Sequence, residues 1–359
     1  MSPGPDLQDF IALSLTPPWR WRAAIDLFRS GVTPRDVLDR LLVQRDDVAP
    51  SLSANRLRVR AGAAIGRANA AGLAPITLSD RAYPSALAAI VDPPFVLWTR
   101  GPTDVLHQPA VAIVGSRAGS PYALAVAERL AADLASRGIV IVSGLARGVD
   151  SAAHRGALQG GGSTVAVLGS GADRVYPSEH AALAVQIQRT GVVASELAPG
   201  TPPLPHFFPL RNRIISGLAR AVVVIEAGEK SGSLITARLA LEQGRDVLAV
   251  PGNVLSGRNR GAHALLRDGA RIVETADDVV DELGLTIRVG DGSRLAADRL
   301  PSAASRDPVL GCFSVGEVLD FDEIAERSGL RPARLLPRLL ELELGGLVAR
   351  AGGGRFVRS

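Results

Sequence analysis

A short apolar strand, a glycine- or serine-rich turn and a helical segment recur in that order between residues 111 and 272. The strand ends read VAIVGSR (111–117), VIVSGLARG (140–148), AVLGSGADR (166–174), VVVIEAGEKSGS (222–233) and LAVPGN (248–253). Near-continuous apolar strands are typical of parallel sheets that are buried on both faces. The pattern therefore predicts an α/β fold, a doubly wound, extended Rossmann-like, mostly parallel sheet of six or seven strands.

The turns indicate the kind of ligand that such a sheet would hold. Turns of this composition present backbone N–H groups and helix N-termini, which bind phosphate oxygens. Six basic side chains lie in or beside them: Arg117, Arg147, Arg174, Arg211, Arg213 and Lys230. These loops share one edge of an open parallel sheet, and a basic rim there is the footprint of a polyanion. The sequence offers no Ser-His-Asp set, metal cluster or pair of convergent carboxylates, so we expect binding without catalysis, metal or cofactor.

Composition limits the class of protein more than the net charge does. Hydrophobic residues make up 47% of the 359 positions and charged residues 21%, which allows a large core. The formal charge of +4 is too small to indicate nucleic-acid binding by itself, and codon bias explains why Lys230 is the only lysine. The first residues, MSPGPDLQDF, lack the basic start and apolar run of a secretion signal, so secretion is not expected. No run reaches the ~18 apolar residues that a membrane span requires. We therefore expect no membrane partner. The single cysteine, Cys312, favours the reducing cytoplasm.

Three regions flank or form this sheet. Residues 1–72 predict short helices, interrupted at Pro17-Pro18 and restarted with Thr33 as N-cap and Pro34 in the first position. This region is either a small helical bundle of the SAM type or a degenerate helix-hairpin-helix domain. The core spans 73–285, and the polar, aperiodic segment 286–308 is a linker.

The last region, 309–359, predicts a winged-helix domain. Asp322 is expected to cap a first helix, RPARLLPRLLELELGG forms a second, and a glycine-tipped hairpin follows. Eight acidic residues and eight arginines cancel between 301 and 359, although Arg350, Arg355 and Arg358 make the wing basic. Contact with DNA and contact with protein both remain open for this domain.

Two common nucleotide-binding motifs are missing. A dinucleotide site needs G-x-G-x-x-G after the first strand and an acid at the end of the second, but this chain has GSRAGS and Ser143. AGEKSGS resembles only the tail of a P-loop. ATP hydrolysis and dinucleotide chemistry are therefore not expected.

Two stretches carry side chains that suggest a function. In SGLARGVDSAAHRGAL (143–158), Asp150 and His154 lie one helical turn apart, and we favour a structural hydrogen bond over a general base. FFPLRNRIISGLA (207–219) places two aromatic residues before Arg-Asn-Arg, a combination that suits unpaired bases and phosphates. The alternative is an aromatic plug in the core, with an arginine paired to Glu196 or Glu226.

These motifs together resemble one family. IVGSR, VSGLARGVDSAAHRGAL, Tyr176-Pro177, Ser195-Glu196, FPLRNRIISGL, SGSLITARLALEQGR and VPGN follow in this order. The chain is similar to the DNA-processing protein A family, also called DprA or Smf. The resemblance implies a non-enzymatic protein of natural transformation that binds and protects incoming single-stranded DNA and loads a RecA-type recombinase.

The strand-end loops and this resemblance define the expected sites. The expected DNA-binding residues are Gly115, Ser116, Arg117, Gly144, Arg147, Phe208, Arg211, Asn212, Arg213, Lys230, Ser231, Gly232 and Ser233. The resemblance also implies a homodimer formed through GAHALLRDGARIV (261–273), with His263, Leu266 and Ile272 as candidates.

One enzyme class remains as the alternative function. The family core is also similar to Rossmann-like phosphoribohydrolases, whose P-G-G-x-G-T-x-x-E signature supplies a catalytic glutamate. Here residues 237–240 of SGSLITARLA stand where that acid should fall.

Overall fold

The computed structural model describes residues 6–43, 53–284, 307–313, 317–344, 347–351 and 354–358. The chain divides into two compact units, one of residues 1–118 and 127–285 and the other of residues 119–126 and 286–359. The predicted linker lies outside the described residues except for its last two positions.

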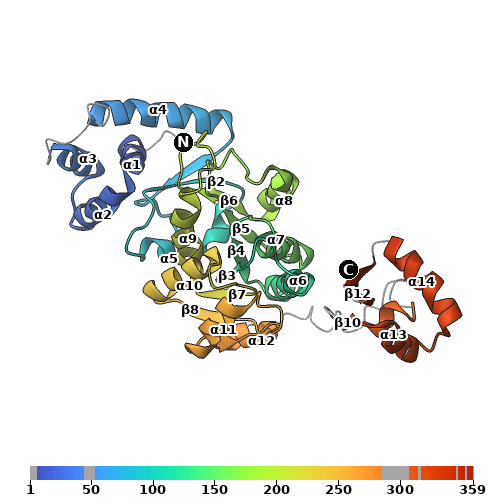
Figure 1. Ribbon diagram of the computed structural model, residues 1–359. Coiled ribbons are helices and arrows are strands. Elements are labelled where there is room, and N and C mark those ends of the chain that lie inside the picture. The colour runs from blue at the N-terminus through green and yellow to red at the C-terminus, as the bar shows by residue number, and fades with distance from the viewer. Residues whose placement is uncertain are drawn as a thin grey trace. The chain divides into compact units, whose positions relative to one another are not determined.

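The larger unit is built on a nine-stranded sheet in the order β1-β2-β6-β5-β4-β3-β7-β8-β9 (Figure 1). Its strands are β1 (Ala74–Thr77), β2 (Val96–Arg100), β3 (Ala110–Val114), β4 (Val140–Ser143), β5 (Thr164–Val167), β6 (Val192–Ser195), β7 (Ala221–Val224), β8 (Asp246–Ala249) and β9 (Arg271–Ile272). Strands β3 to β9 are parallel, whereas β2 pairs antiparallel with both β1 and β6.

The doubly wound, mostly parallel class is confirmed, but the predicted number of six or seven strands is wrong. The edge strands account for the difference. Strand β1 is only half-buried and pairs antiparallel, and β9 has two exposed residues. Neither therefore carries the continuous apolar run by which a buried parallel strand is recognised.

The order of the strands creates a switch point beside β3. The chain runs from β3 through β4 and β5 to β6 in one direction, and β7, β8 and β9 then continue on the other side of β3. In open α/β sheets the crevice at the carboxyl ends of the two strands flanking such a reversal is the usual ligand site. Here those two strands are β3 and β7.

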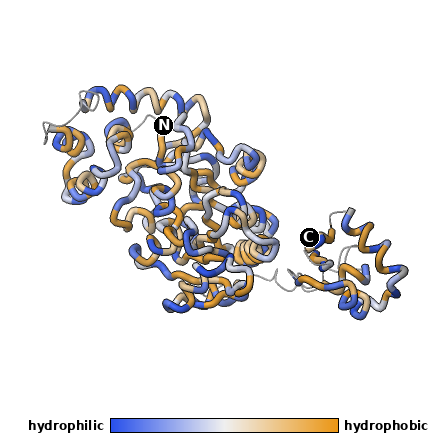
Figure 2. The backbone as a smooth tube through the Cα atoms, in the orientation of Figure 1, coloured by the Kyte–Doolittle hydropathy of each residue, from blue (hydrophilic) through white to orange (hydrophobic). Residues whose placement is uncertain are grey.

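Helices cover both faces of the sheet. They are α5 (Ser85–Ala88), α6 (Pro121–Ser136), α7 (Val149–Gln159), α8 (Ala181–Thr190), α9 (Phe207–Leu218), α10 (Gly232–Glu242), α11 (Arg260–Arg267) and α12 (Ala276–Glu282). Helices α7 and α8 pack on one face, and α5, α9 and α10 pack on the other (Figure 1). Hydrophobic segments are concentrated in the interior of this unit, as the tube in Figure 2 shows.

The N-terminal helices share a core with the edge of the sheet. They are α1 (Leu7–Ser14), α2 (Trp21–Arg29), α3 (Pro34–Val43) and α4 (Ala54–Ala70), with a 3-10 turn at Pro18–Arg20. Thr33 caps α3 as predicted, because its hydroxyl accepts a hydrogen bond from the Asp36 backbone N–H at 3.2 Å. Phe10, Ile25 and Leu57 pack with Trp98 of β2 in one hydrophobic cluster.

The smaller unit has the predicted helix, turn, helix and hairpin. It consists of β10 (Val318–Leu319), α13 (Phe321–Ser328), α14 (Pro332–Leu344), β11 (Val348–Ala351) and β12 (Arg355–Arg358), with β12 central in a three-stranded sheet. The predicted cap, Asp322, is wrong. Asp320 is the N-cap, because its carboxylate accepts from the Glu323 N–H at 2.8 Å while Glu323 accepts from the Asp320 N–H.

Candidate nucleic-acid interface

A pocket of about 790 Å³ opens at the switch point between β3 and β7. Its lining contains every predicted DNA-binding residue except Gly144, Arg147 and Arg213. The other lining residues are Val114, Ala118, Ala146, Asp150, Tyr176, Pro205, Pro209, Ile215, Gly228, Ile235 and Thr236. Residues from five separate stretches of sequence therefore meet at the edge that the strand pattern predicts.

The turn after β3 forms one wall of the pocket. The backbone N–H of Ser116 donates to the Glu226 carbonyl at 2.7 Å, which ties this turn to the loop after β7. The Ser116 carbonyl in turn accepts from the Val149 N–H at the start of α7, at 3.2 Å. The turn is thus fixed between two loops, and Arg117 projects from it as an exposed side chain.

The N-terminus of α10 forms the facing wall. Ser231 caps this 11-residue helix by accepting from the Ser233 N–H, and the two serine hydroxyls lie 2.7 Å apart. The first turn of a helix presents free N–H groups and the positive end of the helix dipole. Lys230 is exposed immediately before the cap. This wall is therefore suited to an anion such as a phosphate group.

An aromatic surface lies on a third side. Phe208, at the start of α9, is half-buried, and its ring centroid lies 5.5 Å from that of Tyr176. The Arg117 guanidinium carbon lies 5.4 Å from the centroid of the Phe208 ring. Tyr176, which is 44% exposed, was identified from sequence only as part of a motif and not as a site residue. Its place in the glycine-rich turn after β5 was the available signal.

Arg211 supplies a buried positive charge to the pocket. Its side chain is 5% exposed, and its Nη1 donates to the Gly144 carbonyl at 2.7 Å and to the Val167 carbonyl. A Cβ at position 144 would overlap this guanidinium, so glycine is required there. Burial and the nearby Arg117 charge lower the pKa of Arg211 to about 10, while Asp150 opposes the shift. The group remains charged at neutral pH.

The turn after β4 is already filled by its own carboxylate. Asp150 Oδ2 accepts from the Gly144 N–H at 3.2 Å and from the Ala146 N–H at 3.4 Å. Leu145 between them has a φ of 57°, which bends the turn around Asp150. The N–H of Gly144 is thus used within the protein, and the geometry gives Gly144 a structural place instead of the predicted DNA contact.

Arg147 and Arg213 also differ from the expected arrangement. Arg147 is exposed and makes a two-point ion pair with Glu179, at 2.7 and 2.9 Å, outside the pocket. Arg213 is only 3% exposed, and its Nη1 and Nη2 bind the Glu196 carboxylate at 2.9 and 2.6 Å. The partner is one of the two acids that the sequence offers as the alternative to a DNA contact.

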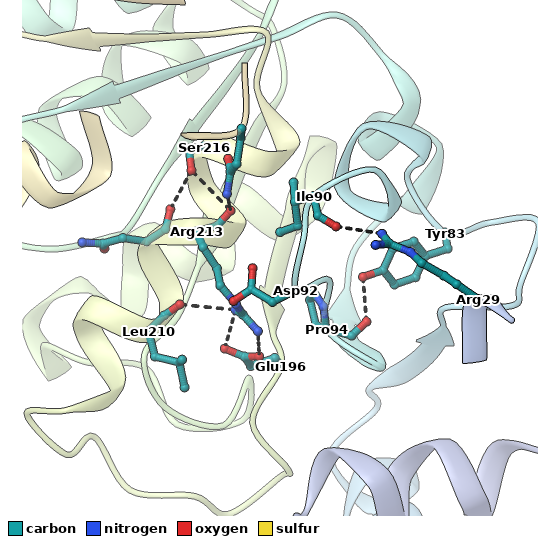
Figure 3. Close-up of polar contacts among 11 residues, drawn as sticks. Arg29, Tyr83, Ile90, Asp92, Pro94, Glu196, Leu210, Arg213 and Ser216 are labelled. Carbon is teal, nitrogen blue, oxygen red and sulfur yellow. Dashed lines mark hydrogen bonds and ion pairs between the residues drawn. The ribbon is translucent and has the colours of Figure 1, made fainter. Parts of the chain in front are cut away.

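Figure 3 shows how this ion pair anchors α9. The Nε of Arg213 donates to Asp92 at 3.0 Å, and its guanidinium lies 5.4 Å from the Trp21 ring of α2. The loop that carries Asp92 is held in turn, because Arg29 donates to the Ile90 carbonyl at 2.8 Å. Arg213 therefore connects the helix that bears Phe208 to the N-terminal helices.

His154 has the environment of a structural residue. It is fully buried, and its Nδ1 lies 2.7 Å from the Thr164 hydroxyl on β5, so its hydrogen bond goes to Thr164 and not to Asp150. Burial, followed by the charges of Arg211 and His180, lowers its pKa to about 3. A neutral imidazole without access to the pocket is not placed to act as a general base.

The candidate dimer residues lie at the far edge of the sheet. His263 is half-buried, with its Nε2 3.1 Å from the Gly252 carbonyl, and Leu266 packs against the main core. Ile272, on edge strand β9, is 56% exposed. Ile272 is therefore the member of this group whose side chain lies largely on the surface.

Metal ligands and membrane spans were also considered. The described residues contain no group of three or more His, Cys, Asp or Glu side chains arranged to hold a metal ion. Within the same ranges, every helix is too short or too polar to cross a bilayer.

The fold and the pocket define a Rossmann-like protein with a crevice at its switch point, lined by basic side chains and a helix N-terminus, and with a separate winged-helix unit. The family model described as DNA recombination-mediator protein A matches residues 74–284, and that of the DprA winged helix domain matches residues 294–354. The chain belongs to the DNA recombination-mediator protein A family, known as DprA or Smf, and is a DNA-processing protein.

Relatives and solved structures agree with this assignment. Protein Smf of Escherichia coli is 41% identical over 282 residues, which cover 77% of this chain and 75% of the relative. The DNA processing protein DprA of Streptococcus pneumoniae is 47% identical over 206 residues, 57% of this chain and 73% of the relative.

The crystal structure of the S. pneumoniae protein matches 76% of this chain and 95% of its own, with 36% identity and a TM-score of 0.67. DprA of Helicobacter pylori, whose structure describes a single-stranded DNA binding mode, matches 59% of this chain and 97% of its own, with 31% identity and a TM-score of 0.54.

Proposed function

We propose that the pocket between β3 and β7 binds single-stranded DNA without sequence preference. The observation that carries the proposal is the meeting of three features in one pocket: the capped N-terminus of α10, the charges of Arg117, Arg211 and Lys230, and the aromatic face of Phe208 and Tyr176. Phosphate groups fit the first two, and unpaired bases fit the third. The single-stranded DNA binding mode described for the H. pylori relative supports the proposal.

The geometry narrows the predicted set of contacts. Phosphate contacts are proposed for Gly115, Ser116, Arg117, Asn212, Lys230, Ser231, Gly232 and Ser233, and base stacking for Phe208. Arg211 contributes charge from the buried side. Gly144 and Arg213 support the site without touching DNA, and Arg147 reaches phosphate only if it leaves Glu179.

Arg117→Ala tests the electrostatic part. We expect weaker binding to all sequences and a salt dependence of affinity that is smaller by about one unit, because one phosphate contact is lost. Fluorescence anisotropy with single- and double-stranded oligonucleotides over a salt series measures both. Arg129→Ala, which removes an exposed arginine from α6, is the matched control. If Arg117→Ala changes neither the DNA affinity nor its salt dependence, residues 115–117 form a turn and do not bind phosphate.

Phe208→Ala tests the stacking part. We expect a loss of ~1–3 kcal/mol in binding free energy, the usual cost of removing one base-stacking aromatic ring. Phe208 is half-buried, so thermal melting is measured in parallel. A variant that melts early but binds with wild-type affinity when folded would assign the ring to core packing.

The phosphoribohydrolase alternative is not favoured. In the predicted position of the catalytic acid, Ala237 and Ala240 are fully buried in the core. Asp150 is the acidic side chain among the described residues that line the pocket, and it binds the N–H groups of its own turn. We therefore propose a binding protein and not an enzyme. Release of a free base from nucleoside monophosphates incubated with the protein would contradict this.

The wider role is proposed from the family. We propose that the chain acts in the cytoplasm during natural transformation, protects incoming single-stranded DNA and loads a RecA-type recombinase on it. The domain division at 1–72, 73–285, 286–308 and 309–359 belongs to the same proposal. The loading role would be supported if RecA filaments assemble faster on single-stranded DNA coated with this protein than on bare single-stranded DNA.

A homodimer through residues 261–273 is proposed on the same basis, because pairing would place two basic faces on one strand. Of the three candidates, Ile272 has the most exposed side chain, whereas His263 and Leu266 have contacts within their own chain. Ile272→Arg should therefore yield folded monomers by light scattering. A wild-type protein that is monomeric at micromolar concentration would refute the dimer.

A further inference from the structure

A short loop beside the pocket exposes two aliphatic side chains to solvent. It follows β8 and spans residues 252–259, and at its tip Val254 is 76% exposed and Leu255 is 92% exposed. Leu255 has the largest exposed fraction among the exposed large hydrophobic residues of the described chain. A ligand that covers these two adjacent apolar side chains would gain free energy by removing their surface from water.

The loop is held in place at both ends. Asn259 is buried, and its side chain accepts from the Ala227 N–H at 3.0 Å and donates to the Val250 carbonyl at 3.1 Å. A Cβ at Gly252 would overlap the Asn259 amide, so only glycine allows this closure. At the tip, the Leu255 N–H donates to the Asn253 side chain at 2.8 Å. These bonds present the apolar tip on a fixed base.

The loop borders the pocket directly. Arg258 donates from Nη1 to the carbonyl of Ala118, a pocket-lining residue, at 3.0 Å. The Gly261 N–H donates to the Ala227 carbonyl at 2.8 Å, next to the pocket-lining Gly228. A DNA strand that leaves the pocket past Ala118 or Gly228 therefore meets this loop next.

The charge around the tip identifies the occupant. Arg258 and Arg260 are exposed beside it, and Lys230 lies on the adjoining loop. Arg260 pairs with Glu229 only at 3.9 Å, with both side chains about two-thirds exposed, so this pair contributes little. A basic rim around an apolar tip suits a polyanion that also offers flat apolar faces. Single-stranded nucleic acid has both properties.

We propose that Val254 and Leu255 form a second subsite, against which the bases next to the pocket pack while Arg258 and Arg260 bind their phosphates. Apolar side chains are known to press against or between bases in other DNA-binding proteins. This subsite rests on the proposed function, because it extends the same strand beyond the pocket. It lengthens the bound segment without requiring a particular sequence.

The test uses the full chain with both tip residues changed, Val254→Ser and Leu255→Ser. Val59→Ser, a 72% exposed aliphatic residue on α4, is the control. Anisotropy is measured with an oligothymidine of about 4 nucleotides, one of about 12, and a third of about 12 in which the added units are abasic. Thermal melting checks that each variant is folded.

The expected result is selective for the longer base-bearing strand. The tip variant should bind it about tenfold more weakly than wild type, while the short and abasic strands bind unchanged. If wild type binds none of the strands, the proposed function itself fails. If wild type binds and the tip variant matches it on all three, the subsite alone is overturned.

Two further outcomes would also overturn the subsite. An equal loss on the abasic strand would mean that the loop acts through the backbone and not through base packing. A change in molecular mass by light scattering, without selective loss on the longer strand, would mean that the tip contacts a second copy of the chain.

Discussion

Replacing Arg213 by methionine should strongly destabilise the larger unit, because it leaves a carboxylate buried without its partner. The side chains of Arg213 and Glu196 are 4% and 5% exposed, and their two hydrogen bonds measure 2.9 and 2.6 Å. Although burial opposes the charged form, the Glu196 carboxylate keeps the pKa of Arg213 above its ordinary value. Burial raises the pKa of Glu196 above its ordinary value, while the charge and hydrogen bonds of Arg213 oppose that shift. The two short contacts between the groups are those of an ion pair.

The magnitude follows from this burial. Removing one member of a buried ion pair costs about 3–5 kcal/mol, since the remaining charge has lost both water and its partner. The contact with Asp92 adds little, because that carboxylate is 42% exposed. Against a total stability of roughly 5–15 kcal/mol for a domain, such a loss is large.

Urea denaturation followed by far-UV circular dichroism measures the free energy of unfolding. Arg220→Met is the control, because Arg220 is an exposed arginine two residues after the end of α9. Replacing both partners, with Arg213→Met and Glu196→Leu together, should recover most of the loss, since no buried charge remains. DNA affinity measured below the unfolding transition should also fall, because α9 carries Phe208.

Two results would refute this reasoning. A loss below about 1 kcal/mol in Arg213→Met would mean that the pair is no stronger than a surface salt bridge. A double variant as unstable as the single one would mean that the arginine acts through packing against Trp21 and not through its charge.

Three further outcomes are expected. The free energy of unfolding should fall as pH drops from 6.5 towards about 3, by at most ~1.4 kcal/mol per pH unit. The reason is that the unfolded chain protonates His154 in this range, whereas the folded chain keeps it neutral. Urea titrations of wild type and His154→Gln at several pH values measure the effect. Asp320→Ala should destabilise the winged-helix unit by about 1 kcal/mol in thermal melts, whereas Asp322→Ala should cost less, because it removes only a favourable first-turn charge. Gly144→Ala should lower both stability and DNA affinity by displacing the guanidinium beneath it, whereas Gly66→Ala, in open space on α4, should be tolerated.

Turn composition predicted the position of the pocket well, because the physical rule is topological. Glycine- and serine-rich turns after parallel strands must share an edge, and the strand order then selects the two turns that face one crevice. The sequence does not contain the strand order in any local form. It therefore could not show that Ser116 and Ser231 line the pocket, whereas Gly144, whose N–H donates to Asp150, does not.

The two arginines of the RNR segment show a different limit. Arginine is rarely buried unless it is paired, so its presence beside aromatic residues predicted exposed phosphate contacts. Every residue of α9 from Arg211 to Leu218 is buried, and the partners come from distant strands and loops. Glu196 was identified as a possible partner for one arginine, but the carbonyls of Gly144 and Val167 that hold Arg211 cannot be read from side-chain types.

The winged-helix cap was predictable from the sequence, but the prediction placed it two residues too late. The stretch DFDE offers two aspartates, but only Asp320 has a glutamate three residues on, which is the spacing of a capping box. Asp322 lies within the first turn, where its charge favours the helix dipole but its side chain cannot cap. Spacing is thus a better guide to a helix start than residue type alone.

The pocket combines two kinds of positive charge that act differently on a phosphate. Arg117 and Lys230 are exposed, so their attraction is screened by salt and binding through them releases counterions. Arg211 is buried and held by backbone carbonyls, so its charge is fixed before the ligand arrives and is screened much less. Asp150, the acidic side chain among the described lining residues, accepts a hydrogen bond from the Gly144 N–H. It thereby fixes the turn whose Gly144 carbonyl accepts from Arg211. This arrangement supports the proposal that the pocket binds a phosphate chain.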